Sequence, residues 1–104
     1  DDILNFTTMR LITKESIQAF EQNRSFKKSN MEVEVLPCTT ILKYQGNSIA
    51  FKQGQSLKIT NCGWFSNTTK ERLNALNGVS LYQKNFIWYL NGKEWDGQLI
   101  EVNK

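Results

Sequence analysis

Histidine is absent from this 104-residue sequence, and its absence removes several kinds of chemistry at once. Imidazole is the commonest general base, the central member of serine and cysteine triads, and the commonest side-chain ligand of transition metals. Glycine is also scarce: the six glycines are scattered over predicted turns and form no glycine-rich phosphate loop. These gaps predict a protein that is not an enzyme and that holds no cofactor and no metal ion.

Long apolar runs and a leader pattern are missing as well. No run approaches the ~20 apolar residues that a membrane span needs. The first residues are acidic and no continuous apolar stretch follows them, which argues against a signal peptide. The expectation is a cytoplasmic protein that has no contact with a membrane.

Cysteine occurs only twice, as Cys38 and Cys62. There is no CxxC pair and no histidine to complete a zinc site. A nucleophilic cysteine would also lack an imidazole base to activate it. Without a secretion signal, two reduced structural thiols are the preferred interpretation, with a disulfide as the alternative.

The composition that remains is that of one globular domain, residues 1–104, with 39% hydrophobic and 12% aromatic residues. Residues 1–30 are expected to form a helix and a basic loop. The helix is predicted over about 14–23, with Thr13 as its N-cap and Ile12 and Ile17 as a hydrophobic staple. Residues 24–30 are predicted to be the basic loop.

From Met31 onward the hydrophobic period is two, which predicts an antiparallel meander over residues 31–60 with turns at 46–47 and 53–54. A helix over about 69–77 is inserted next, with Thr68 and Glu71 as a capping box. Strands over 79–84 and 86–90 follow. Asn91-Gly92 is a strong hairpin signal, and residues 99–102 are expected to close an edge. The predicted fold class is α+β.

Basic residues dominate the middle of the chain, although the net charge is only +3. Between residues 35 and 93, Glu71 stands alone against seven basic residues: Lys43, Lys52, Lys58, Lys70, Arg72, Lys84 and Lys93. An acidic partner such as a nucleic acid would suit this balance. The predicted partner-binding surface consists of Lys27, Lys28, Trp64, Thr69, Lys70 and Arg72.

Two physical features motivate that choice. The start of a helix offers free backbone N–H groups to a phosphate, and Thr69 and Lys70 stand there. Aromatic side chains can stack on unpaired bases, and the candidates are Trp64, Phe65, Trp88, Tyr89 and Trp95. Two alternatives remain open: the aromatic residues fill the core, or they join arginine in a protein interface. Arg72 could also pair locally with Glu71 and matter only to stability.

The segments Asn61-Cys62-Gly63-Trp64 and 67–74 (NTTKERLN), with the closing hairpin 88–95 (WYLNGKEW), resemble a group of small uncharacterised phage and prophage proteins. The likeness covers roughly residues 26–97. It implies a viral accessory protein made in the cytoplasm of a bacterial host. The preferred hypothesis is that such a protein binds nucleic acid through its basic surface; the alternative is that it blocks a bacterial defence or nucleic-acid-handling complex as an anti-CRISPR does. A structural or virion-associated subunit is the third possibility.

Overall fold

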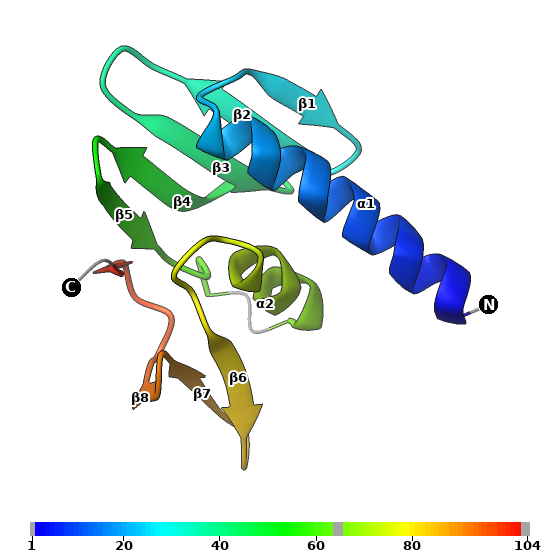
Figure 1. Ribbon diagram of the computed structural model, residues 1–104. Coiled ribbons are helices and arrows are strands. Elements are labelled where there is room, and N and C mark those ends of the chain that lie inside the picture. Colours follow the sequence, from blue (N-terminus) through cyan, green and yellow to red (C-terminus); the bar gives the residue numbers. More distant parts are fainter. Residues whose placement is uncertain (1, 64–65, 103–104) are drawn as a thin grey trace.

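A computed structural model describes residues 2–63 and 66–102, with only the backbone described for residues 2–10. The fold is α+β, as predicted: two helices accompany two antiparallel sheets (Figure 1). Along the chain the elements are α1 (Asp2–Glu21), β1 (Phe26–Lys28), β2 (Met31–Val35), β3 (Thr40–Tyr44), β4 (Asn47–Gln53), β5 (Ser56–Ile59), α2 (Asn67–Asn74), β6 (Leu81–Lys84), β7 (Ile87–Leu90), β8 (Lys93–Glu94) and β9 (Ile100–Glu101).

The larger sheet has six strands in the order β1-β2-β3-β4-β5-β9, so the predicted meander is confirmed. Its β3–β4 turn lies one residue earlier than predicted, at residues 45–46, because Tyr44 already pairs with Asn47. Gln45 and Gly46 both have positive φ (51° and 82°), as a tight two-residue hairpin requires. The β4–β5 turn lies one residue later than predicted, at residues 54–55, because Gln53 still pairs with Ser56. Strand β9 pairs with β5, so the C-terminal segment does close an edge.

The first helix is longer than predicted, and Thr13 is not its N-cap. Helix α1 begins at Asp2, and Thr13 lies buried within it at 5% exposure. Two inward-facing residues of α1, Thr13 and Ser16, are polar, which hid the apolar period that a sequence reading depends on. The predicted basic loop is also partly a strand, because Phe26 pairs with Val33 at the edge of the sheet.

The second helix begins and ends earlier than predicted. Its N-cap is Ser66, whose hydroxyl accepts a hydrogen bond from the Thr69 backbone N–H at 3.1 Å. The predicted capping box of Thr68 and Glu71 is therefore wrong, and the Glu71 carboxylate instead accepts a hydrogen bond from Arg72. Serine at position 66 serves the same capping chemistry two residues upstream.

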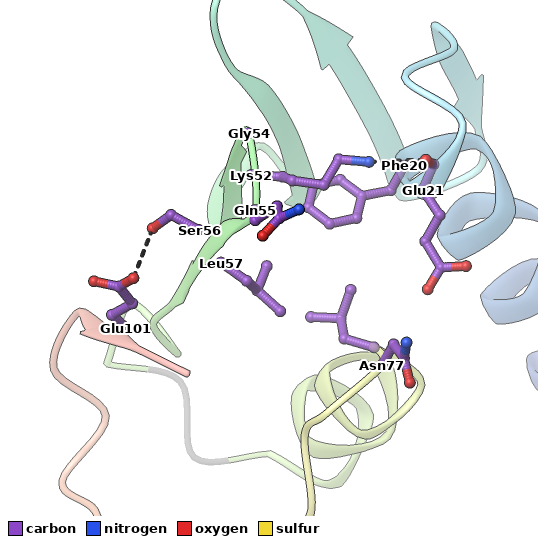
Figure 2. A pocket seen from close by; sticks show the side chains of 10 residues that line it. Phe20, Glu21, Lys52, Gly54, Gln55, Ser56, Leu57, Asn77 and Glu101 are labelled. Carbon is purple, nitrogen blue, oxygen red and sulfur yellow. Dashed lines mark hydrogen bonds between the residues drawn. The ribbon is translucent and has the colours of Figure 1, made fainter. Parts of the chain in front are cut away.

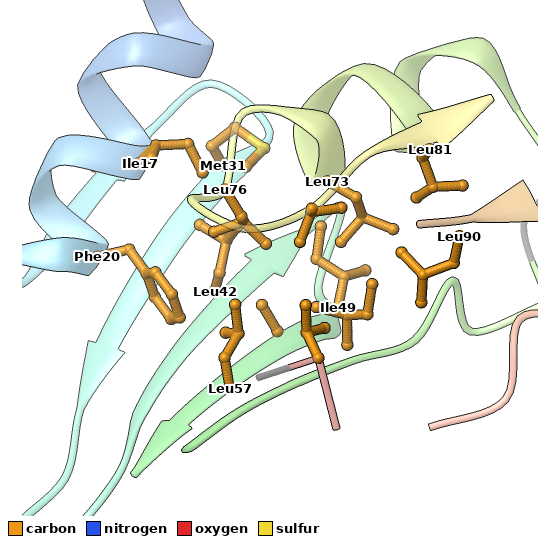
Figure 3. Packing of buried hydrophobic residues seen from close by; sticks show 14 of the residues in the cluster. Ile17, Phe20, Met31, Leu42, Ile49, Leu57, Leu73, Leu76, Leu81 and Leu90 are labelled. Carbon is orange, nitrogen blue, oxygen red and sulfur yellow. The ribbon is translucent and has the colours of Figure 1, made fainter. Parts of the chain in front are cut away.

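A cavity opens where the end of α1 approaches β5 (Figure 2). Beside it, both helices pack against one face of the six-stranded sheet, and their apolar side chains meet those of the strands (Figure 3). The fully buried members include Phe20, Met31, Leu42, Ile59 and Leu73. Leu81, Trp88 and Leu90 of the smaller sheet join the same cluster, so one core holds both sheets together.

The smaller sheet has the order β6-β7-β8. The predicted Asn91-Gly92 hairpin turn is confirmed, with φ of 50° and 88° at its two central residues. Strands β6 and β7 form a second hairpin around Asn85 and Phe86. That hairpin extends beyond α2, away from the six-stranded sheet (Figure 1).

Candidate interaction surface

The two predicted lysines of the N-terminal part lie exposed on the edge strand β1. Lys28 donates to the Glu15 carboxylate of α1 at 3.0 Å, so part of its charge is met within the molecule. Lys27 lies opposite Glu32 in the register of β1 and β2. Both lysines remain accessible, but each has an acidic neighbour.

The start of α2 does not present the predicted phosphate site. Thr69 is fully buried, and its side-chain and backbone groups are engaged with the Ser66 hydroxyl. Lys70 is half-buried: its ammonium lies 3.3 Å from the Gln83 side-chain oxygen and 5.6 Å from the centre of the Trp88 ring. Thr69 is therefore a structural residue, and Lys70 packs against the smaller sheet.

Arg72 is the clearest correction, because only 3% of it is exposed. Its guanidinium donates to the Glu71 carboxylate and to the Thr13 hydroxyl, the latter at 2.6 Å. It also reaches the Met31 sulfur at 3.3 Å and lies over the Tyr44 ring. The structure therefore agrees with the alternative given above, in which Arg72 pairs locally with Glu71.

Two further basic residues of the middle segment, Lys43 and Lys58, have acidic neighbours. Lys43 forms a 2.8 Å ion pair with Glu34 on the sheet face opposite the helices. The hydrogen bond that the Lys43 ammonium donates to the Glu34 carboxylate raises the pKa of Lys43 above its ordinary value, and the charges of Glu34 and Glu32 add to that rise. Lys58 lies opposite Glu101 in the strand register. Lys43 and Lys58 each therefore face a carboxylate within the molecule.

Two of the proposed stacking aromatic residues belong to the core. Trp88 and Trp95 are 3% and 6% exposed, and their rings pack against each other at 6.2 Å. Tyr89 is half-buried and stacks on Tyr82, with ring centres 5.2 Å apart and planes 12° from parallel. Trp64 and Phe65 lie outside the described residues. Filling of the core, one of the alternatives above, accounts for both tryptophans.

The exposed aromatic surface lies instead on the β6–β7 hairpin. Tyr82 is 45% exposed and Ile87 37%, and both share the outer face of the smaller sheet with Lys84 and Tyr89. At the tip, Phe86 is 94% exposed, the highest value among the large hydrophobic residues that the structure describes. We call Tyr82, Lys84, Phe86, Ile87 and Tyr89 the aromatic hairpin.

The turn of the aromatic hairpin is strained. Asn85 and Phe86 have φ of 53° and 67°, the left-handed pair that the β3–β4 and β7–β8 hairpins also use. In those hairpins the second residue is glycine: Gly46 follows Gln45 and Gly92 follows Asn91. A side chain at such a position costs about 1–2 kcal/mol, so phenylalanine is an unfavourable choice for the turn itself.

The base of the aromatic hairpin is held firmly. The Asn74 side-chain amide donates to the Leu81 carbonyl at 2.7 Å and accepts from the Leu81 N–H at 2.6 Å, so it substitutes for a neighbouring strand. The Asn91 side chain bonds the Ser80 N–H and the Gly78 carbonyl. A tip on such a base is presented in a defined position.

Sequence reasoning missed this surface because it placed Phe86 inside a strand over 86–90. The available signal was Asn85, a residue that tolerates positive φ, between two runs of strand-forming residues. No local sequence signal indicated whether the tyrosines or the tryptophans would face the core.

The cavity near the end of α1 has a volume of about 850 Å³ (Figure 2). Phe20, Leu57 and Leu76 contribute its apolar wall, and Glu21 and Glu101 stand at its edge. Lys52 reaches across to the Glu21 backbone carbonyl at 2.8 Å and lies over the Phe20 ring. Burial lowers the pKa of Lys52, and the negative charge of Glu21 opposes that fall.

Both cysteines are free and exposed in the structure. The Cys62 thiol donates to the Ser48 carbonyl, and partial burial raises its pKa above the ordinary value. That both thiols are reduced in the native protein stays a prediction. Titration of protein purified without reductant and then denatured should find two thiols, and a monomer with none would contradict it.

In the part of the chain that the structure describes, no three side chains with ligating carboxylate or thiolate groups come together around a possible metal position. No helix in that part is long and apolar enough to cross a bilayer.

Fold and surface thus define a small α+β protein with a projecting aromatic hairpin. Residues 9–102 match the family model described as Kyanoviridae Gp96 protein, and the chain belongs to that family of phage proteins of unknown function. Comparisons with curated proteins and with solved structures find no match.

Proposed function

We propose that this phage protein is a non-enzymatic accessory protein that acts in the cytoplasm of the infected bacterium by binding another protein through the aromatic hairpin. The observation that carries the proposal is the combination of exposure and strain at Phe86. Neither property stabilises the isolated fold, because the Phe86 side chain buries almost no surface and its left-handed backbone conformation costs free energy. Backbone strain of this kind is concentrated at functional positions.

A protein partner suits the hairpin better than a nucleic acid does. A projecting aromatic side chain that fills a pocket is typical of the energetic centre of a protein interface. The charge at the hairpin is small, since Lys84 and Lys93 stand beside Glu94. Binding to phosphates draws most of its affinity from several cations together, and two of the exposed or partly exposed lysines, Lys28 and Lys43, are already paired with carboxylates. Nucleic acid therefore becomes an outcome that the test must distinguish.

The test compares capture of partners from host lysate by the wild-type chain, by Phe86→Gly and by Leu99→Ser. Glycine suits the turn, so Phe86→Gly should keep its stability or gain up to about 1 kcal/mol while partner capture falls at least about tenfold. Leu99 is a matched control, because it is also exposed and apolar, at 55%, but lies outside the hairpin, in the segment between β8 and β9.

Two further conditions identify the kind of partner. Capture that survives nuclease and moderate salt supports a protein, whereas capture that disappears with nuclease and falls steeply with ionic strength indicates nucleic acid. Equal capture by wild type and Phe86→Gly would refute the hairpin as the binding element. If the partner is a bacterial defence or nucleic-acid-handling complex, the protein is an inhibitor; if it is a phage structural protein, the chain is a virion-associated subunit.

A further inference from the structure

The cavity beside α1 has the features of a receptor for an aromatic side chain. Phe20, Leu57 and Leu76 offer apolar surface, and Figure 2 shows Leu57 directed into the open space. Its volume of about 850 Å³ exceeds what one phenyl ring needs. The side chain of Lys52 lies across one side, with its ammonium turned onto Glu21's carbonyl oxygen.

The charges of the cavity and of the hairpin tip are complementary. Two carboxylates line the cavity, those of exposed Glu21 and of Glu101, which accepts a hydrogen bond from Ser56, and they outnumber the one ammonium there, that of Lys52. The hairpin carries exposed Lys84 two residues before Phe86. A phenyl ring entering the cavity would therefore bring a lysine close to carboxylates.

The two features cannot meet within one molecule. In Figure 1 the turn between β6 and β7 lies at the bottom, whereas the end of α1 and the β4–β5 turn lie in the upper part, on the far side of α2. The base of the hairpin is fixed in the core by Leu81, Trp88 and Leu90. Contact between tip and cavity thus requires two copies of the chain.

We infer that Phe86 of one copy enters the cavity of a second copy, which joins copies head to tail. This inference rests on the proposed function, since it names the partner of the same aromatic hairpin. The contact is heterologous, so a pair of copies keeps one free tip and one free cavity, and assembly continues into a ring or an open chain. One buried phenyl ring must offset the entropy of association, so the affinity of a single contact is expected between about 10 μM and 1 mM.

The experiment is sedimentation velocity of the full chain from about 10 μM to 1 mM. The average mass of the wild type should rise with concentration, and Phe86→Gly should stay monomeric while keeping its circular dichroism spectrum. Asn77→Trp places a large side chain at an exposed position of the cavity wall and should also stay monomeric. Mixing the two variants should then give one-to-one heterodimers and nothing larger, because only one intact tip and one intact cavity remain in each pair.

Charge reversal provides a second test that leaves the core untouched. Glu21→Lys alone and Lys84→Glu alone should each weaken self-association about three- to tenfold, and the double variant should recover most of the loss. A wild type that stays monomeric at 1 mM, a Phe86→Gly variant that associates normally, or a mixture that yields no heterodimer would each overturn the inference. A monomeric chain that still captures another protein through Phe86 would overturn it while the proposed function stands.

Discussion

Replacing Arg72 by alanine should cost about 3 kcal/mol of folding free energy, although the sequence alone predicts a cation on the protein surface at this position. The substitution removes a guanidinium that is only 3% exposed and leaves the Glu71 carboxylate and the Thr13 hydroxyl without their shared donor. Breaking a buried ion pair from one side costs about 3–5 kcal/mol. The lower end applies here, because a quarter of the Glu71 side chain is exposed and can regain water.

Urea unfolding followed by tryptophan fluorescence measures this cost, since Trp88 and Trp95 are buried and will report the loss of the core. Lys70→Ala is the matched control on the same helix. Its ammonium contacts Gln83 and the Trp88 ring from a half-exposed position, so its loss should cost less than about 1 kcal/mol. If Arg72→Ala unfolds at the same urea concentration as Lys70→Ala, the buried-pair reasoning is refuted.

Two further substitutions test local packing. A Cβ on Gly97, where φ is +90°, would lie 2.2 Å from the Asn61 side-chain oxygen, so Gly97→Ala should lose about 3 kcal/mol of folding free energy. The control Gly46→Ala, at φ +82° with open space around it, should lose only about 1 kcal/mol. Similar losses for the two variants in urea unfolding would contradict the clash. Asn74→Ala removes both hydrogen bonds to the Leu81 backbone, so it should cost about 1–2 kcal/mol of folding free energy and speed amide hydrogen exchange at Leu81. Unchanged exchange at Leu81 would show that the Asn74 side chain does not protect this edge of the smaller sheet.

Much of the fold could be predicted because its signals are local. The alternation from Met31 to Val35 and the Asn91-Gly92 turn depend on a period of two and on a left-handed turn, and both are correct in the structure. Boundaries were less predictable. Thr13 resembles a helix cap by residue type, yet it lies inside α1, where its hydroxyl accepts a hydrogen bond from Arg72, 59 residues later in the chain.

The candidate site was predicted less well, for a similar reason. Lys27, Lys28 and Lys70 lie at accessible or half-accessible positions, but their neighbours Glu15, Glu32 and Gln83 come from other elements. The charge density of a linear segment says nothing about which carboxylates will fold against it. The tryptophans were equally ambiguous, since a tryptophan suits either a core or an interface.

By itself, then, the sequence determined the secondary-structure class, the antiparallel meander and the Asn91-Gly92 hairpin turn, because hydrophobic period and turn chemistry act over a few residues. Only the tertiary structure decided that Arg72 would be buried and that Phe86 would project. Burial depends on which distant surfaces meet: Met31 and Thr13 close around the guanidinium, whereas nothing among the described residues folds over the tip of β6 and β7.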